Sequence, residues 1–308
     1  MLNPRLEYLH EVAIQGSMCA ASEKLGVAVS SVSRQLAKLE KDLGIALLER
    51  AGRSVRLTEA GEVALAHYRD RVASEESFEA HIGELKGSRV GRVAIACGEV
   101  FLGKAISELI VRWSSDSPGA SIHIRTGTTN EIIRCVVDDE VHMGVMLQIP
   151  AEPKIRVRAT LSQPIKALVH PRHPLAAQRQ VSLRAMTQHR LCLPERGFRL
   201  RQIIGQAEAQ DGISLNAQLA SNSLALLKDL VRTGSYATLL PDFAAMNELS
   251  NGELISIPIA SPSLENVSAN LVCRLGRQLS GIPARVLGSL ESALHAWGAG
   301  ANQPVRAA

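Results

Sequence analysis

The sequence is poor in aromatic residues and has no long apolar run. Only 3% of the 308 residues are Phe, Trp or Tyr, although 46% are hydrophobic, so aliphatic side chains must fill the core. No run of about 18 apolar residues occurs, which excludes a typical membrane-spanning helix. The charged start, MLNPRLEYLHEV, differs from a secretory signal. We therefore expect a cytoplasmic protein that does not associate with membranes.

Motifs for metal binding, disulfides and catalysis are also missing. The 5 cysteines are scattered and lack CxxC spacing, a pattern typical of a reducing compartment. The chain contains no P-loop and no GxSxG, HExxH or GxGxxG motif. His170 and His173 belong to HPRHP, which is typical of a proline-rich turn. We predict that the chain is not an enzyme and needs neither a metal nor a cofactor.

The net charge of +4 is a weak sign of a polyanionic partner, but basic residues gather in one segment. A local basic patch is a better indication of nucleic-acid binding than the total charge. Between residues 34 and 56 the basic residues are Arg34, Lys38, Lys41, Arg50, Arg53 and Arg56, and the acidic ones are Glu40, Asp42 and Glu49.

Three short helices are predicted at the N-terminus. Apolar residues at helical spacing predict helices over about 3–15, 18–25 and 30–43, with Ser17 as the N-cap of the second. A short turn, 26–28, joins the second helix to the third. This spacing is typical of a helix-turn-helix.

The third helix combines serines and basic residues with an apolar stripe. Its N-terminus carries Ser30, Ser31 and Ser33, followed by Arg34 and Lys38 on a polar face. Helix N-termini and hydroxyls bind phosphates, and arginine pairs with guanine in the major groove. The alternative is that Ser30 or Ser31 caps the helix and that the basic residues are merely solvated. The neighbouring elements favour a DNA-recognition helix.

The next segment predicts a hairpin and then a long helix. ALLERAGRSVRLT indicates two short strands with Arg53 at the tip, and Thr58 is a suitable N-cap for a helix over 59–86. An apolar stripe on that helix predicts a homodimer. KGSRVGR, which ends at residue 92, indicates a hinge. From residue 93 strands alternate with helices, which predicts a parallel sheet.

The segment AASEKLGVAVSSVSRQLAKLEKDLGIALLERAGRSVRLTEAG resembles the N-terminal signature of LysR-type transcriptional regulators. GFRLRQIIGQAEAQDGI, ASNSLALLKDLVRTGSYATLLP and ALVHPRHPLA resemble parts of that family's effector domain. The resemblance implies an α/β fold: a winged helix-turn-helix, a linker helix, and a two-subdomain effector module of periplasmic-binding-protein type. The implied domains are 1–58 for DNA binding, 59–86 for the dimerisation helix, 87–92 for the hinge, 93–297 for the effector domain and 298–308 for a flexible tail. Subdomain I would span about 93–162 and 267–297, and subdomain II about 163–266.

The resemblance also implies partners and contacts. The partners would be double-stranded promoter DNA, an unidentified small-molecule effector and further copies of the chain, as a homodimer through 59–86 and a homotetramer. Ser33 and Arg34 match recognition positions of the family, and Arg53 matches a wing residue. Val29 and Ser30 stand where the family commonly has Gln-Pro. Valine cannot form glutamine's two hydrogen bonds to adenine, although it can contact a thymine methyl.

The effector would bind between the subdomains, near strand ends and helix N-termini. The residues predicted there are Gly98, Glu99, Val100, Thr128, Thr129, Phe198, Arg199, Asn222 and Ser223. The threonines and Asn222 could instead be loop or cap residues. Glu99 would repel an anionic ligand unless Arg196 or Arg199 compensated it. Either the ligand therefore carries a cationic or hydroxyl group, or Glu99 faces outward.

Two other kinds of protein stay open at this point. A thiol-based redox switch could use Cys97 near the cleft or Cys192 on a strand. Buried free cysteines more often act as small apolar residues. A solute-binding module for transport is disfavoured by the DNA-binding motif.

Overall fold

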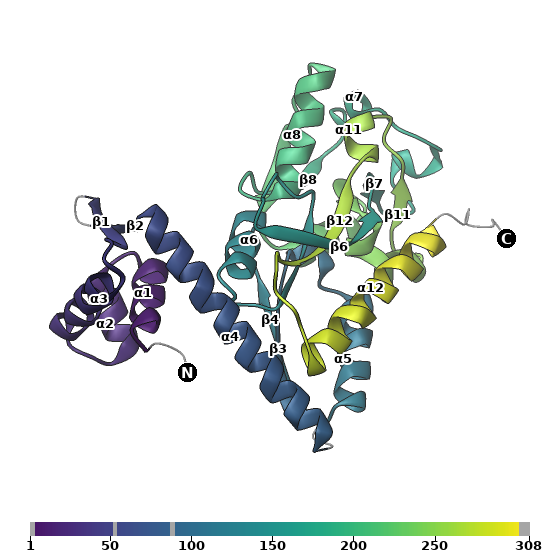
Figure 1. The fold of residues 1–308 in the computed structure, drawn as a ribbon. Helices are drawn as coiled ribbons and strands as arrows, with labels where there is room; N and C mark the ends of the chain where they lie inside the picture. The colour runs from purple at the N-terminus through teal and green to yellow at the C-terminus, as the bar shows by residue number, and fades with distance from the viewer. Residues whose placement is uncertain (1–3, 52–53, 87–89, 302–308) are drawn as a thin grey trace. The chain divides into compact units, whose positions relative to one another are not determined.

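The computed structural model describes residues 4–51, 54–86 and 90–301. The chain forms two compact units. The first contains residues up to Lys86 together with Gly276–Ser280, and the second contains Gly87–Leu275 and the chain from Gly281 onward. Figure 1 shows the elements of both units.

The first unit is a small helical domain with a two-stranded hairpin and a long helix. Its core contains Leu9, Leu36 and Leu47, all almost fully buried. Strands β1 and β2 pair antiparallel. The elements are α1 (Pro4–Gln15), α2 (Met18–Leu25), α3 (Val29–Leu43), β1 (Leu48–Ala51), β2 (Ser54–Leu57) and α4 (Glu59–Leu85).

The start of α4 packs closely against the residue before the hairpin. The Thr58 hydroxyl accepts a hydrogen bond from Gly61 N at 3.1 Å, as expected for an N-cap. A Cβ added to Gly61 would lie 2.1 Å from the Leu47 carbonyl oxygen. Only glycine allows this approach of two backbone segments.

The second unit is built around a five-stranded sheet with the strand order β4-β3-β5-β12-β6. Helix α6 packs on the face that carries Ala94, Ala96 and Val272. Helix α12 contacts β3 and β6, on the other side of the sheet in Figure 1. The strands are β3 (Val90–Cys97), β4 (Gly119–Thr126), β5 (Met143–Leu147), β6 (Ile155–Ser162) and β12 (Ser268–Arg274). The helices are η1 (Glu99–Phe101), α5 (Lys104–Asp116), α6 (Thr129–Val137) and α12 (Gly281–Ala301).

The middle of the chain forms the rest of this unit. It contains a three-stranded antiparallel sheet, β10-β7-β11, and a parallel pair, β8-β9. The strands are β7 (Ile165–Val169), β8 (Leu191–Pro194), β9 (Ala217–Ser221), β10 (Thr238–Pro241) and β11 (Ile255–Ile257). The helices are η2 (Pro174–Ala177), α7 (Leu183–Met186), α8 (Arg199–Asp211), α9 (Leu224–Arg232), η3 (Asp242–Ala245), α10 (Met246–Ser250) and α11 (Pro262–Glu265).

Three details differ from the expectations. The five-stranded sheet is mixed rather than wholly parallel, because β12 returns antiparallel between β5 and β6, and the three-stranded sheet is antiparallel. Residues 90–92 of the expected hinge are already part of β3, where they pair with residues 119–121 of β4. The helix α12 continues through residues 298–301, which were expected to be tail.

Candidate DNA interface and effector cleft

Helix α3 is positioned by its buried face and by the turn before it. Val32, Leu36 and Leu39 are buried in the core of the first unit. Gly26 ends α2 with a φ of 66°, in the left-handed region that favours glycine. The turn between α2 and α3 is therefore only three residues long. Helix α3 begins at Val29 rather than at Ser30.

The N-terminus of α3 has no side-chain cap. Its N-cap residue is Ala28, which has no polar side-chain atom. The alternative that Ser30 or Ser31 is the N-cap is therefore wrong. Ser30 and Ser33 are exposed and Ser31 is half-buried. In contrast, the expected cap of α2 is present, because Ser17 Oγ accepts a hydrogen bond from Ala20 N at 3.1 Å.

The two basic residues predicted on α3 are exposed. Arg34 Nε donates to Ser30 O at 3.2 Å, and its Nη2 lies 3.5 Å from Ser31 Oγ. The guanidinium therefore lies over the first turn of the helix. These contacts are long and solvent-exposed, so they hold it weakly. Lys38 lies one helical turn further on, while Arg53 lies outside the described residues.

Two acidic residues near this basic face are engaged by the domain itself. Glu40 Oε1 accepts hydrogen bonds from Leu47 N at 2.7 Å and Leu48 N at 3.1 Å, at the base of the hairpin. Asp42 forms an ion pair with Arg5. From the sequence, Glu40 is recognisable only as an acidic residue. No motif predicts that its carboxylate binds a backbone N–H seven residues away.

The second unit contains a small cavity where several strands and helices end. Its free volume is about 40 Å³, enough for a few water molecules. Seven of the nine predicted effector residues line it: Gly98, Glu99, Val100, Thr128, Thr129, Phe198 and Arg199. Gly127, which begins the expected segment 127–130, also lines it, and the lining residues that were not predicted are Phe101, Ile132, Met146, Leu147, Pro194, Leu200 and Leu224. Most of these are apolar, and an apolar residue at a strand end looks like any core residue in a sequence.

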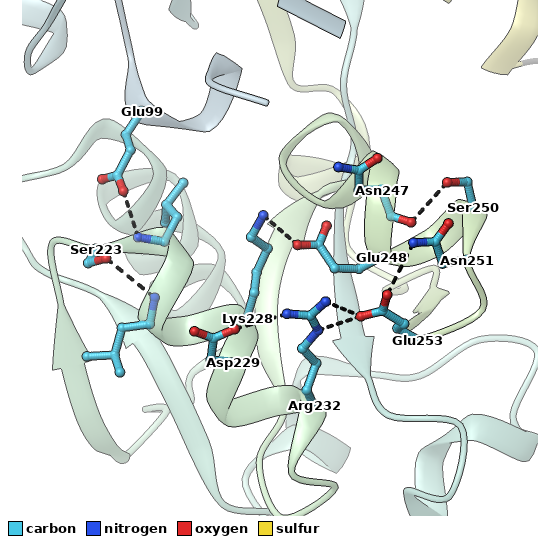
Figure 2. Close-up of polar contacts among 12 residues, drawn as sticks. Glu99, Ser223, Lys228, Asp229, Arg232, Asn247, Glu248, Ser250, Asn251 and Glu253 are labelled. Atoms are coloured by element: carbon cyan, nitrogen blue, oxygen red, sulfur yellow. Dashed lines mark hydrogen bonds and ion pairs between the residues drawn. The ribbon is translucent and has the colours of Figure 1, made fainter. Parts of the chain in front are cut away.

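Glu99 faces inward, so the alternative of an outward-facing side chain is wrong. Its Oε1 accepts a hydrogen bond at 2.9 Å from Leu224 N, the first residue of α9 (Figure 2). Among the described residues no basic side chain lies within 4.0 Å of this carboxylate. Neither Arg196, which is exposed, nor Arg199 forms an ion pair with it.

Asn222 and Ser223 are not among the residues that line the cavity. Ser223 is the N-cap of α9, and its Oγ accepts from Leu226 N at 3.4 Å. The cap role considered for Asn222 therefore belongs to its neighbour. These residues belong to the loop that presents Leu224 N to Glu99.

The two threonines differ in their contacts. Thr128 is the N-cap of α6 in a reciprocal capping box with Glu131. Its N donates to Glu131 Oε2 at 2.7 Å, and its hydroxyl donates to the same oxygen at 2.9 Å. The backbone hydrogen bond and then the hydroxyl bond lower the pKa of Glu131. Thr129 is the first residue of the helix, so both threonines lie at its positive end.

Arg199 lies at the start of α8, on the wall of the same cavity. Its Nη1 donates to Gln202 Oε1 at 3.3 Å, and its Nη2 donates to Gln148 Oε1 at 3.5 Å. Its Nε is buried and has no hydrogen-bond partner within the described part of the chain. The N-cap of α8, Phe198, forms no side-chain cap.

Comparison with protein families decides the identity of the chain. The model described as "LysR substrate binding domain" matches residues 86–293, and "Bacterial regulatory helix-turn-helix protein, lysR family" matches residues 4–62. The chain belongs to the LysR family. It is a DNA-binding transcriptional regulator with an effector-binding domain.

Individual relatives of this LysR-family chain are regulators too. A probable nitrogen assimilation transcriptional activator from Synechococcus elongatus is 28% identical over 84% of this chain and 86% of its own length. A full-length OxyR variant from Pseudomonas aeruginosa has a TM-score of 0.67, with 18% identity over 96% of this chain and 95% of that one. Full-length CbnR complexed with its target DNA has a TM-score of 0.53 and 21% identity, over 96% and 100% of the two chains. These structures show the shared fold.

The cysteines of this LysR-family chain differ in accessibility. Cys97 and Cys192 are buried, and burial raises the pKa of each thiol to about 11. Few of these thiols are ionised at neutral pH, which disfavours a redox switch. Cys19 is exposed. Among the described residues no group of three His, Cys, Asp or Glu side chains is arranged to hold a metal ion. No described helix has the length and hydropathy to cross a membrane.

Proposed function

We propose that this regulator recognises promoter DNA through the N-terminal half of α3 and through the tip of its hairpin. The contact residues would be Ser30, Ser31, Ser33, Arg34, Lys38 and Arg53. The observation that carries this proposal is the uncapped start of α3 beside exposed hydroxyls and exposed basic side chains. Phosphates would bind at the helix N-terminus, and Arg34 would bind a base in the major groove.

The cavity of the second unit is proposed as the effector site, with Asn222 and Ser223 supporting it from behind Leu224. Ligand binding there would change the arrangement of the walls and, through it, the binding of DNA. The free volume of about 40 Å³ is too small for an organic effector, so the cavity must open to admit one.

Assembly and location complete the proposal. A homodimer would form through residues 59–86, since α4 carries the exposed apolar side chains Val63, Phe78 and Leu85. A homotetramer would extend it, and the protein would act in the cytoplasm, where promoter DNA is found. We also propose that it has no catalytic activity, in line with relatives that are named as regulators.

Capture of genomic DNA fragments by the purified protein at physiological salt, followed by sequencing, tests this function. The expected result is enrichment of a few promoter fragments that share a partly palindromic site. Absence of sequence preference, with and without candidate ligands, would contradict the proposal.

A further inference from the structure

Two helices that begin at the cavity already have their N-termini occupied by oxygens of the chain. At α9, Glu99 accepts from Leu224 N and Ser223 accepts from Leu226 N. At α6, Glu131 accepts from Thr128 N within the capping box. An anionic ligand would normally bind such N–H groups. Here it would have to displace a carboxylate that is already in place.

The Glu99 carboxylate favours a cationic group on the ligand rather than an anionic one. It lines the cavity, and one of its oxygens is bound by a neutral backbone N–H (Figure 2). Within the described residues it has no cationic partner. A protonated amine on a ligand would add the attraction between opposite charges to its hydrogen bond with this carboxylate, which the neutral Leu224 N–H cannot do.

The wall formed by the start of α8 suits an acid instead. Arg199 is the second charged residue that lines the cavity, and its buried Nε has no partner in the described structure. Phe198 gives α8 no side-chain cap, so the positive end of this helix remains open. A ligand carboxylate there would meet a guanidinium and free N–H groups.

We propose that the cavity binds an amino acid. Its ammonium group would bind Glu99, and its carboxylate would bind Arg199 at the start of α8. An apolar side chain would contact the remaining wall, which includes Val100, Ile132 and Leu200. This inference rests on the proposed effector role of the cavity and adds the chemical class of the ligand.

The same contacts link binding to a change in the cavity. The cavity volume of about 40 Å³ is well below the roughly 300–1,000 Å³ of typical ligand pockets. The ligand ammonium would bind the same Glu99 carboxylate that accepts from Leu224 N, so the two donors would share its charge. Binding of the amino acid would therefore weaken the Glu99–α9 contact and favour a conformation in which α9 is less tightly held.

Thermal unfolding of the full-length protein with each standard amino acid in turn is the first test. At least one with an apolar side chain should raise the apparent Tm, because a ligand that binds only the folded state stabilises it. Each positive amino acid is then compared with the analogues that lack one group. For L-leucine these are 4-methylpentanoate, without the amine, and 3-methylbutylamine, without the acid. Each analogue should bind at least about tenfold more weakly.

Matched variants assign the amine to Glu99. Glu99→Gln keeps an oxygen that accepts from Leu224 N but removes the charge, so amino-acid affinity should fall about tenfold or more while the unliganded Tm changes little. Glu108→Gln removes an exposed carboxylate on α5 that is absent from the cavity lining, and it should leave the affinity unchanged.

Three results would overturn the inference. They are an unchanged Tm with every amino acid, an amine-free analogue that binds as tightly as its amino acid, and equal losses in Glu99→Gln and Glu108→Gln. The genomic DNA capture, carried out on the same preparation, separates the two proposals. Promoter enrichment without amino-acid binding contradicts only the ligand class, whereas loss of sequence preference contradicts the proposed function.

Discussion

Helices α3 and α6 begin in opposite ways. Helix α6 begins with a complete capping box between Thr128 and Glu131, and its N-terminus is satisfied by the chain. The N-cap of helix α3 is Ala28, which offers no side-chain oxygen, although serines stand at positions 30 and 31. An uncapped helix costs stability, typically about 1 kcal/mol. The α6 terminus is therefore satisfied by the chain itself, and we propose that the open α3 terminus binds an external anion.

The largest expected effect comes from disturbing the packing of α4 within the first unit, which also contains α3. Gly61→Ala places a Cβ 2.1 Å from the Leu47 carbonyl oxygen, so α4 and the hairpin base must move apart. Such overpacking against a backbone should destabilise the first unit by about 3 kcal/mol. Denaturant unfolding measures the loss, and DNA affinity should fall with it.

The matched control for this change lies on the same helix. A Cβ on Gly83 would meet no atom within 4 Å. Gly83→Ala should therefore be neutral or raise stability by up to about 1 kcal/mol, because alanine favours helix. Equal effects of the two substitutions would show that the close approach at Gly61 is unimportant.

The next effect concerns the exposed basic face of α3. Arg34→Ala should weaken binding to an enriched promoter fragment by about 1–3 kcal/mol and relax the preference for one sequence. Arg71→Ala, which removes the same charge from an exposed position on α4, is the control and should have little effect. Fluorescence anisotropy with specific and scrambled duplexes measures both. An equal loss on the two duplexes would make Arg34 a phosphate contact.

A smaller effect is expected at the capped terminus. Thr128→Ala removes the hydroxyl from the α6 capping box and should cost about 1 kcal/mol, as measured by chemical unfolding. Thr129→Ala, one residue further on and outside the cap, should cost much less. A similar loss in both would mean that the capping box does not stabilise the helix.

The capping box should also make stability depend on pH. The folded-state pKa of Glu131 is lowered, chiefly by the backbone hydrogen bond from Thr128. Its contribution is therefore fully present above the ordinary value of 4.5 and is lost as the pH falls through the lower folded value. The stability difference between the wild type and Glu131→Gln should shrink below pH 4.5, because glutamine has no charge to lose. A constant difference would contradict this account.

Local features of the chain were predictable from the sequence. The Ser17 cap, the turn at Gly26 and the Thr58 cap each depend on residues within about one helical turn. The seven predicted residues of the cavity wall were found because they lie between the end of a strand and the start of a helix, where ligands bind in α/β folds.

Long-range contacts were not predictable in the same way. Glu99 and Leu224 are 125 residues apart, and no spacing rule indicates that one caps the helix of the other. The antiparallel return of β12 depends on how the chain passes between the two sheets. Residues 90–92 pair with β4, which is distant in the sequence. Their own composition is typical of a hinge and does not predict this pairing.

The most direct test of the comparison between α3 and α6 is a substitution that gives α3 an N-cap side chain. Ala28 has a φ of −70° and a ψ of 144°, a conformation that suits an N-cap aspartate. Ala28→Asp should stabilise the protein by about 0.5–2 kcal/mol and weaken DNA binding at least about tenfold, since its carboxylate would occupy the place of a phosphate. Unfolding and DNA titration of the same preparation measure both quantities. Greater stability with unchanged DNA affinity would contradict the claim that the open N-terminus of α3 binds DNA.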